Sequence, residues 1–379
     1  MDVDFAVEMG GARRALQRTL ISCCEQLLEM ALTLTYESGQ FLRRLWARKP
    51  LEYPPSGQEA SGDGWVFGNR QYRSQNPRMF VHQPKAAPPV SWNSGGEGDF
   101  LRSEDKVDRP LPRLVSVACG FAKDSAEYPQ YSRGKFGEDA WFMSSNAQAY
   151  VLGVADGVGG WRNYGIDPGE FSMFLMRSCE RFSRAQDFVP ERPDLLLGRG
   201  YCELLEHRCR IVGSCTACIL SLNRANSTLY TANIGDSGFM VVRSGAVICR
   251  SLEQQHHFNT PYQLSSAPPG HEDNVLSDGP ESADTIKLRV ELGDVILLAT
   301  DGVYDNVPEA FLVEALTEMS GISDPVRLQM AANALALMAR TLSYNPNHDS
   351  PFSQNARKLN IEASGGKPDD ITVLLASVV

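Results

Sequence analysis

Four short segments of the sequence each place an Asp or a Glu where a run of apolar residues begins or ends. They are 137–142, 151–160, 295–305 and 365–373, which read GEDAWF, VLGVADGVGG, VILLATDGVYD and GGKPDDITV. A single Asp-Gly pair is ordinary turn chemistry, because both residues favour turns. Four acidic clusters at strand ends would repel one another if the fold gathered them, and a divalent cation would resolve that repulsion.

The candidate ligands are oxygen atoms, and no cluster of His or Cys accompanies them. Oxygen ligands select hard ions, so the sequence predicts Mg²⁺ or Mn²⁺ in preference to zinc. The glycine after Asp156 lets a backbone carbonyl approach the ion. Two such ions could activate a water and hold a phosphate in line for attack, with no covalent enzyme intermediate. Cys215 and Cys218 form a CxxC, but without a second ligand pair we interpret it as part of a buried strand.

The elements that must position these acids are mostly short strands joined by tight turns. We expect two helices, with a shorter third over 309–319, and strands over the following ranges. The helices are 171–184 and 326–342, and the strands are 114–120, 140–142, 149–155, 214–223, 228–234, 238–243, 246–250, 285–290, 294–300 and 371–379. Strands joined by tight turns imply antiparallel sheets, and helices must cover their faces.

Composition narrows the class of protein. The 379 residues carry a formal net charge of -10, which argues against a general nucleic-acid binder. Hydrophobic residues make up 42%, enough for a sizeable core, yet no run reaches the ~18 apolar residues of a membrane span. The nine cysteines follow no regular spacing, which favours reduced thiols inside a cell. Oligomeric state is not readable from the sequence.

Three regions follow from changes in composition along the chain. Residues 1–50 read as a basic amphipathic segment, which is typical both of a mitochondrial presequence and of a partner-binding helix. The Arg-rich pattern favours a presequence, whereas Asp2, Asp4 and Glu8 oppose it. Residues 51–107 are rich in Pro, Gly and Ser and are interpreted as a disordered linker. Residues 108–379 are expected to form the catalytic domain.

Five motifs in this order resemble the metal-dependent type 2C protein phosphatases. They are GED at 137–139, ADGVGGW at 155–161, ANIGDSG at 232–238, TDGVYD at 300–305 and KPDDITV at 367–373. The stretch EQQHHFNTPYQL at 253–264 resembles the T-cell-activation-type branch of that family, the Ptc-seven homologues of mitochondria. The resemblance covers about 114–379 and implies an α+β fold, a four-layer αββα sandwich of two antiparallel β-sheets flanked by helices.

The resemblance also implies roles for single residues at a site for two Mn²⁺ or Mg²⁺ ions. Asp156 would bridge both ions. The Gly157 carbonyl and Glu138 would join it on one ion. Asp301 and Asp369 would hold the other.

Three further acids take supporting roles by the same resemblance. Asp139 would position metal-bound water. Some members of the family bind a weaker third ion through residues that correspond to Asp236 and Asp305. Asp370 stands where many members have Asn, so we rank it below Asp369 as a ligand.

The chain also departs from the family pattern in two places. Many members have a His, a candidate general acid, where this chain has Val158. The family uses an Arg shortly before Glu-Asp to bind phosphate; Arg133 lies one residue off that spacing and Lys135 is nearby, so either is a candidate and either could be a solvated surface residue.

The resulting expectation is a protein serine/threonine phosphatase acting on phosphoproteins, mitochondrial or otherwise cytoplasmic. Two alternatives remain at this point: an inactive phosphatase fold that acts as a binding module, and a phosphatase of small metabolites.

Overall fold

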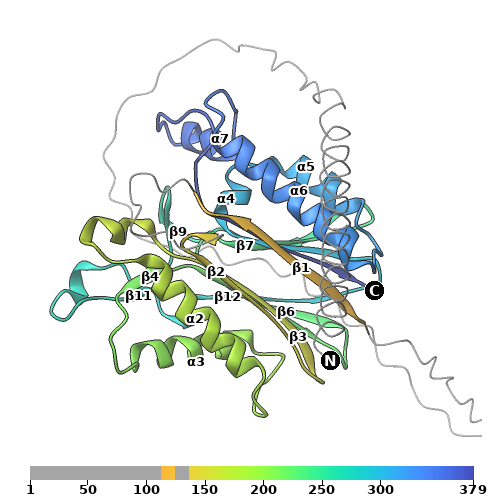
Figure 1. The fold of residues 1–379 in the computed structure, drawn as a ribbon, viewed down its shortest axis with the longest axis horizontal. Coiled ribbons are helices and arrows are strands. Elements are labelled where there is room, and N and C mark those ends of the chain that lie inside the picture. Colours follow the sequence, from red (N-terminus) through yellow and green to blue (C-terminus); the bar gives the residue numbers. More distant parts are fainter. Residues whose placement is uncertain (1–111, 124–135) are drawn as a thin grey trace, which may run out of the picture. The chain divides into compact units, whose positions relative to one another are not determined.

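Two five-stranded antiparallel β-sheets form the centre of the part of the chain that the computed structural model describes, residues 112–123 and 136–379 (Figure 1). The first sheet has the order β1 (Leu114–Phe121), β14 (Ile371–Val378), β13 (Val295–Ala299), β7 (Gly238–Arg243) and β8 (Ala246–Arg250). The second has the order β12 (Asp284–Arg289), β6 (Thr228–Ile234), β5 (Ala217–Asn223), β3 (Ala149–Asp156) and β2 (Asp139–Ser145). Two smaller pairs join β4 (Gly213–Cys215) to β11 (Leu264–Ser266), and β9 (Gln255–His257) to β10 (Thr260–Pro261).

The central strands are mostly apolar because both of their faces are covered. Every residue of β5, β13 and β14 is buried. One face of each sheet contributes to a shared core between the sheets, and alternate side chains point to the helices outside. That shared core includes Leu152, Val154, Leu220, Phe239, Ile296, Leu298 and Leu374.

Helices form the two outer layers (Figure 1). Those packed on the second sheet are α2 (Pro168–Ser183) and α3 (Pro193–Leu205); those packed on the first are α5 (Glu309–Thr317) and α6 (Pro325–Ser343). Shorter elements are η3 (Gly159–Tyr164), η4 (Glu272–Asn274), η5 (Pro280–Ser282), α4 (Asp301–Tyr304) and α7 (Pro351–Lys358). The α2, α6 and α7 helices begin alike: Asp167, Asp324 or Ser350 accepts a backbone N–H bond, and proline follows at the first helical position.

The predicted four-layer αββα sandwich is confirmed, and most strand ranges agree to within a residue or two. One expected range was wrong: the single strand expected over 214–223 is broken at Thr216 into β4 and β5. Helices α3 and α7 and the short strands β9, β10 and β11 were not expected. The segments 1–50 and 51–107 lie outside the described residues, so their predicted boundaries stay predictions. Among the described residues no helix has the length and apolar character that crossing a membrane requires.

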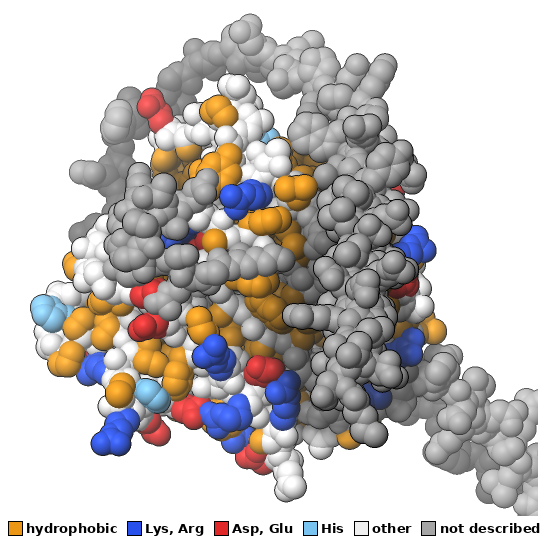
Figure 2. Space-filling view, in the orientation of Figure 1, with side chains coloured by type: hydrophobic (Ala, Val, Ile, Leu, Met, Phe, Trp, Pro, Cys, Tyr) orange, Lys and Arg blue, Asp and Glu red, His pale blue; other side chains and the backbone are white. Residues whose placement is uncertain are grey.

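Charges of both signs are interspersed on the face shown in Figure 2, in the region of helices α2 and α3. Ion pairs there join Arg181 to Glu203 and Arg184 to Glu180. Mixed charge of this kind is typical of a solvated protein surface and differs from the single-sign stripe that nucleic-acid binders present.

Candidate active site

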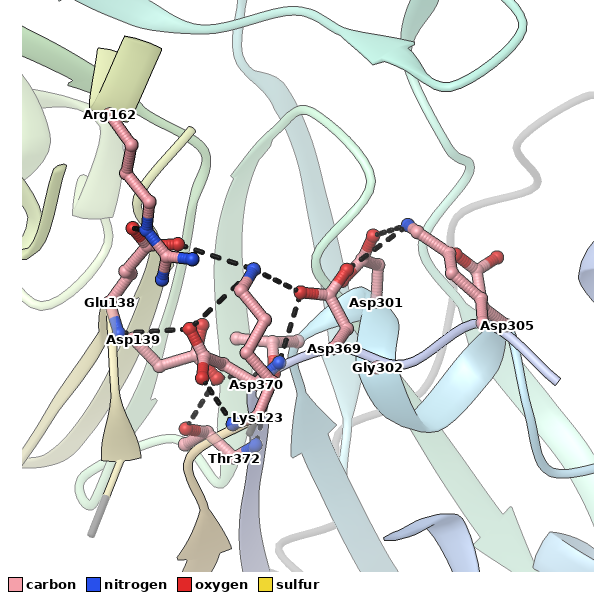
Figure 3. Close-up of polar contacts among 12 residues, drawn as sticks. Lys123, Glu138, Asp139, Arg162, Asp301, Gly302, Asp305, Asp369, Asp370 and Thr372 are labelled. Atoms are coloured by element: carbon pink, nitrogen blue, oxygen red, sulfur yellow. Dashed lines mark hydrogen bonds and ion pairs between the residues drawn. The ribbon is translucent and has the colours of Figure 1, made fainter. Parts of the chain in front are cut away.

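The predicted acidic residues meet at one end of the β-sandwich. Asp139 begins β2 and lies opposite Asp156, which ends the antiparallel strand β3. In the other sheet, β13 runs into Asp301 and the neighbouring strand β14 starts just after Asp369 and Asp370. Antiparallel pairing therefore places the end of one strand beside the start of the next, and carboxylates from both sheets come together (Figure 3).

A cleft of about 370 Å³ opens over these carboxylates. The acids that line it are Asp156, Asp236, Asp301 and Asp369, and Thr216 also lines it. The break between β4 and β5 falls at this Thr216, whose backbone N–H donates to the Asp156 carbonyl over 3.0 Å. The strand is therefore interrupted where it enters the site. The remaining wall residues are Lys123, Gly157, Val158, Gly159, Gly160, Asn259, Thr260, Pro261, Gln263 and Lys367.

Gly157 occupies a position with no room for a side chain. A Cβ atom there would lie 2.8 Å from the Pro168 carbonyl oxygen and 2.9 Å from the Glu138 carbonyl oxygen. The Gly157 N–H also points back to that Glu138 carbonyl over 3.3 Å. Glycine at 157 is therefore required by close backbone approach, and the approach ties the end of β3 to the residue before β2.

Asp156 and Asp139 are held where a negative charge is costly. Burial raises the pKa of Asp156 well above its usual range, and the nearby Asp139, Asp301 and Asp369 raise it further. Burial likewise raises the pKa of Asp139, with Asp370 adding to the effect. Mutual repulsion of this kind is the electrostatic condition that a bound cation would relieve.

Asp139 has one oxygen fixed and one free. Its Oδ2 accepts hydrogen bonds from the hydroxyls of Thr300 at 2.8 Å and Thr372 at 2.7 Å. Its Oδ1 is buried and, within the described part of the chain, accepts no hydrogen bond. The Oδ1 atom of Asp301 is buried and unpaired in the same way. Unpaired buried carboxylate oxygens are costly, so each calls for a ligand or a water.

Two lysines that we did not predict neutralise part of this cluster. The Lys123 Nζ lies 2.8 Å from Asp369 Oδ1 and 3.2 Å from Glu138 Oε2, as Figure 3 shows. The Lys367 Nζ contacts Asp301, lies 2.7 Å from Asp305 Oδ2 and 3.3 Å from Asp369 Oδ2. Burial opposes ionisation of Asp369, but the two ammonium groups outweigh it and lower its pKa to about 2.

The two acids expected at a third ion have different surroundings. Burial raises the pKa of Asp305 to about 7; Lys367 opposes that rise and Asp301 adds to it. Burial also raises the pKa of Asp236 well above its usual range, and Asp301 adds to the shift. The Gln255 side chain donates a long hydrogen bond of 3.4 Å to Asp236 Oδ2.

Glu138 is paired with an arginine that sequence reasoning also missed. The Arg162 Nε donates to Glu138 Oε1, and Arg162 comes from η3, directly after the Gly-rich turn (Figure 3). Burial raises the pKa of Glu138, and Lys123 and Arg162 oppose that rise. The predicted phosphate-binding residues Arg133 and Lys135 lie outside the described residues.

The oxygen atoms of this cluster fit the implied metal ions in chemistry but not in their present spacing. As the side chains lie, no three His, Cys, Asp or Glu within residues 112–123 and 136–379 are spaced to hold an ion. The ammonium groups of Lys123 and Lys367 stand between the carboxylates and supply the positive charge instead. The chemistry of the set nevertheless fits a hard divalent cation, because it is all oxygen, buried, mutually repulsive and partly unpaired.

Comparison with known proteins gives consistent matches. The family model described as "Protein phosphatase 2C" matches residues 134–262. The chain is 50% identical over 284 residues to "Protein phosphatase PTC7 homolog" of Homo sapiens, covering 75% of this chain and 89% of that protein. It is 50% identical over 268 residues to "Protein phosphatase PTC7 homolog fig" of Drosophila ananassae, covering 70% and 81%.

Among solved structures, the chain is similar to "X-ray structure of the photosystem II phosphatase PBCP" with a TM-score of 0.59. The identity is 30%, and the match covers 70% of this chain and 99% of that one.

Proposed function

The chain belongs to the protein phosphatase 2C family, and on that premise we propose that its carboxylate cleft hydrolyses phosphoserine and phosphothreonine in proteins with Mn²⁺ or Mg²⁺ bound. Membership makes it a metal-dependent protein phosphatase, a hydrolase of phosphoproteins. The observation that carries the proposal is that Asp156, Asp301 and Asp369 line one open cleft. Mutual repulsion and unpaired buried oxygens make such a group of acids favourable for binding a divalent cation.

We assign the ligands on the same basis. Asp156 would hold both ions, Glu138 and the Gly157 carbonyl would complete one site, and Asp301 and Asp369 the other. When bound, two such ions supply Lewis-acid stabilisation of the phosphoryl oxygens and a water of lowered pKa.

Asp139 is suited to orient the attacking water. Thr300 and Thr372 hold its Oδ2, so the carboxylate is fixed, and its Oδ1 is left to accept a hydrogen bond. A fixed acceptor aligns the water lone pair with the phosphorus, which is a positioning contribution. Val158 lines the cleft and cannot donate a proton, so the leaving alkoxide takes its proton from another group. Arg133 and Lys135 remain our proposed phosphate-binding residues.

The test uses the purified full chain. Hydrolysis is measured on an aryl phosphate, a phosphoserine peptide and a sugar phosphate, each with Mn²⁺, with Mg²⁺ and with EDTA. We expect the peptide to be hydrolysed only with metal, and activity lost in EDTA to return on adding Mn²⁺. Inactivity on every substrate would favour a binding module, and preference for the sugar phosphate would favour a metabolite phosphatase.

We also propose a mitochondrial location, supported by the Arg-rich amphipathic pattern of residues 1–50. Imaging a reporter fused to these residues tests it. A mitochondrial signal is expected, and a diffuse cytosolic signal would contradict the proposal.

A further inference from the structure

Gln263 is a buried amide residue on the wall of the cleft. It lines the cleft together with Pro261, and only 7% of the residue is exposed. Its N–H donates to Asp278 Oδ2 over 2.9 Å, and the Asp278 N–H donates to the Gln263 carbonyl over 2.8 Å. The Gln263 side chain therefore starts from a fixed backbone position beside the cleft.

A chain of hydrogen bonds fixes the orientation of that amide. The Trp161 Nε1–H, which can only donate, donates to Ser214 Oγ over 2.7 Å. The Ser214 hydroxyl in turn donates to Gln263 Oε1 over 2.6 Å. Ser214 is fully buried, so solvent does not compete with this bond. The oxygen of the Gln263 amide is therefore directed at Ser214, and its nitrogen lies on the other side.

The nitrogen of the same amide lacks a good acceptor. Within the part of the chain that the structure describes, Gln263 Nε2 has one contact, with the Pro261 carbonyl at 3.5 Å. That distance is at the outer limit of a hydrogen bond. Because Pro261 also lines the cleft, the nitrogen end of the amide lies on the cleft side. A buried N–H group without a good acceptor is costly, and a ligand oxygen in the cleft would supply the acceptor.

The Gly-rich turn belongs to the same rigid unit. The Val158 N–H donates to the Ser214 carbonyl over 3.0 Å, and β11, which follows Gln263, pairs with β4, which carries Ser214. The Val158 side chain has no donor of its own. Lys123 and Lys367 also line the cleft, but both ammonium groups contact carboxylates. Gln263 is thus a neutral donor held in a fixed position relative to the turn.

We infer that Gln263 is a substrate-binding residue whose Nε2 donates a hydrogen bond to a phosphoryl oxygen, with Ser214 and Trp161 as positioning residues. The inference rests on the proposed function, because it requires a phosphate ester in the cleft. A hydrogen bond to a charged oxygen changes binding by about 10- to 100-fold. Peptide esters, aryl esters and inorganic phosphate all present phosphoryl oxygens, so the contact should serve all three.

The test measures kcat and KM of the full chain on a phosphoserine peptide and on an aryl phosphate, and inhibition by inorganic phosphate, all in saturating Mn²⁺. Gln263→Met keeps the length of the side chain and removes the amide. We expect its kcat/KM to fall by about 10- to 100-fold on both substrates, and the inhibition constant of phosphate to rise in parallel. Gln263→Glu still accepts from Ser214 but turns a carboxylate toward the phosphate, so it should lose more. Gln148→Glu, at an exposed glutamine between β2 and β3, is the control and should match the wild type.

Ser214→Ala tests the positioning role. It removes the bond that orients the amide, so it should raise the inhibition constant of phosphate by less than Gln263→Met does. Because Ser214 acts through Gln263, adding Ser214→Ala to Gln263→Met should cause little further loss. Losses that add in the double variant would show that Ser214 acts independently and would overturn the positioning role.

The other outcomes separate this inference from the proposed function. A folded Gln263→Met with wild-type kcat/KM and phosphate inhibition would overturn the inference alone, as would a loss confined to the peptide. If the variants do not fold, the wild type labelled with ¹⁵N-glutamine decides: saturation with phosphate and Mg²⁺ should shift a side-chain amide signal, and no shift would overturn the inference. A wild type that hydrolyses no phosphate ester with Mn²⁺ would overturn the proposed function and this inference with it.

Discussion

The backbone N–H of Glu138 donates a hydrogen bond to Asp370 Oδ2 over 2.9 Å, so the residue just before β14 holds the residue just before β2. The other oxygen of Asp370 accepts the Lys123 N–H at 2.7 Å. Gly137 permits this arrangement: its φ is +61°, and a Cβ there would lie 2.0 Å from Asp370 Oδ1. The buried Asp370 carboxylate therefore links the end of β1, the start of β2 and the start of β14 through hydrogen bonds.

Replacing Asp370 tests whether this residue stabilises the fold or binds a metal ion. Asp370→Ala leaves the N–H groups of Glu138 and Lys123 without their acceptor, and we expect a loss of about 2 to 4 kcal/mol in the free energy of unfolding. Asp370→Asn keeps one acceptor and should lose about half as much. Urea denaturation measures both, with Asp187→Ala, at an exposed aspartate, as the control.

This prediction has a clear contrary result. If Asp370→Ala unfolds at the wild-type urea concentration but has lost Mn²⁺ binding, Asp370 is a ligand and our ranking of Asp369 above it is wrong.

Lys123 should contribute more to the free energy of unfolding of the metal-free protein than to that of the metal-bound protein. Its ammonium compensates Asp369 and Glu138, and removing one partner of a buried ion pair costs about 3 to 5 kcal/mol. We expect Lys123→Met to lower the free energy of unfolding by an amount near the lower figure in EDTA. The loss should be smaller in saturating Mn²⁺, because the ions replace the missing charge. Equal losses in the two conditions would contradict this, and Lys287→Met, at an exposed lysine of β12, is the matched control.

The raised pKa of Asp305 should make the free energy of unfolding of the metal-free protein depend on pH. Its pKa is raised to about 7 in the folded chain, mainly by burial, against about 4 in an unfolded chain. The folded state therefore binds the proton more tightly. The stabilising contribution is complete below about pH 4 and is lost as the pH rises through about 7. Asp369, whose pKa is lowered to about 2, behaves oppositely, and its contribution is lost only as the pH falls through that value.

The measurement is the difference between wild type and Asp305→Asn in EDTA at several pH values. Across the window from about pH 4 to 7, the wild type should lose stability relative to the variant, by at most about 1.4 kcal/mol per pH unit. Parallel curves for the two proteins would show that folding leaves the pKa of Asp305 unchanged and would contradict the expected shift.

Strands were the most predictable part of the fold. The ranges of β6, β7 and β8 were predicted to the residue, because short β-branched and aromatic runs between turn residues have few alternatives. Helix α3 was missed for a physical reason. It contains Gly198 and Gly200, which disfavour helix locally, yet a Cβ at Gly200 would lie 2.7 Å from Cys179 Sγ of α2. Packing against α2 therefore requires glycine at position 200, and that same glycine lowers the helix propensity from which α3 could have been predicted.

The acids of the site were predictable because strand ends mark where side chains leave the sheets. The lysines were not, since neither Lys123 nor Lys367 lies within a strand or helix, and their side chains reach the cleft from connecting segments. One signal was present: Lys367 stands two residues before Asp369 in a segment with two adjacent acids. A cluster of buried carboxylates needs counter-charge in the metal-free state, and a lysine in the same motif is a natural source.

Asp156 offers the most direct test of the central claim that its carboxylate holds the ions that hydrolysis needs. Mn²⁺ binding and kcat/KM on a phosphoserine peptide are measured on the same preparations of wild type and Asp156→Asn. The variant should fold at least as stably without metal, because it removes a buried charge whose pKa is raised. Mutating a residue that only hydrogen-bonds to a metal ligand lowers metal affinity or activity by about 10 to 100-fold. Because Asp156 is proposed as a ligand itself, we expect Mn²⁺ affinity and kcat/KM each to fall by at least about 100-fold. Activity within a few-fold of wild type in Asp156→Asn, or undiminished activity in EDTA, would contradict the account.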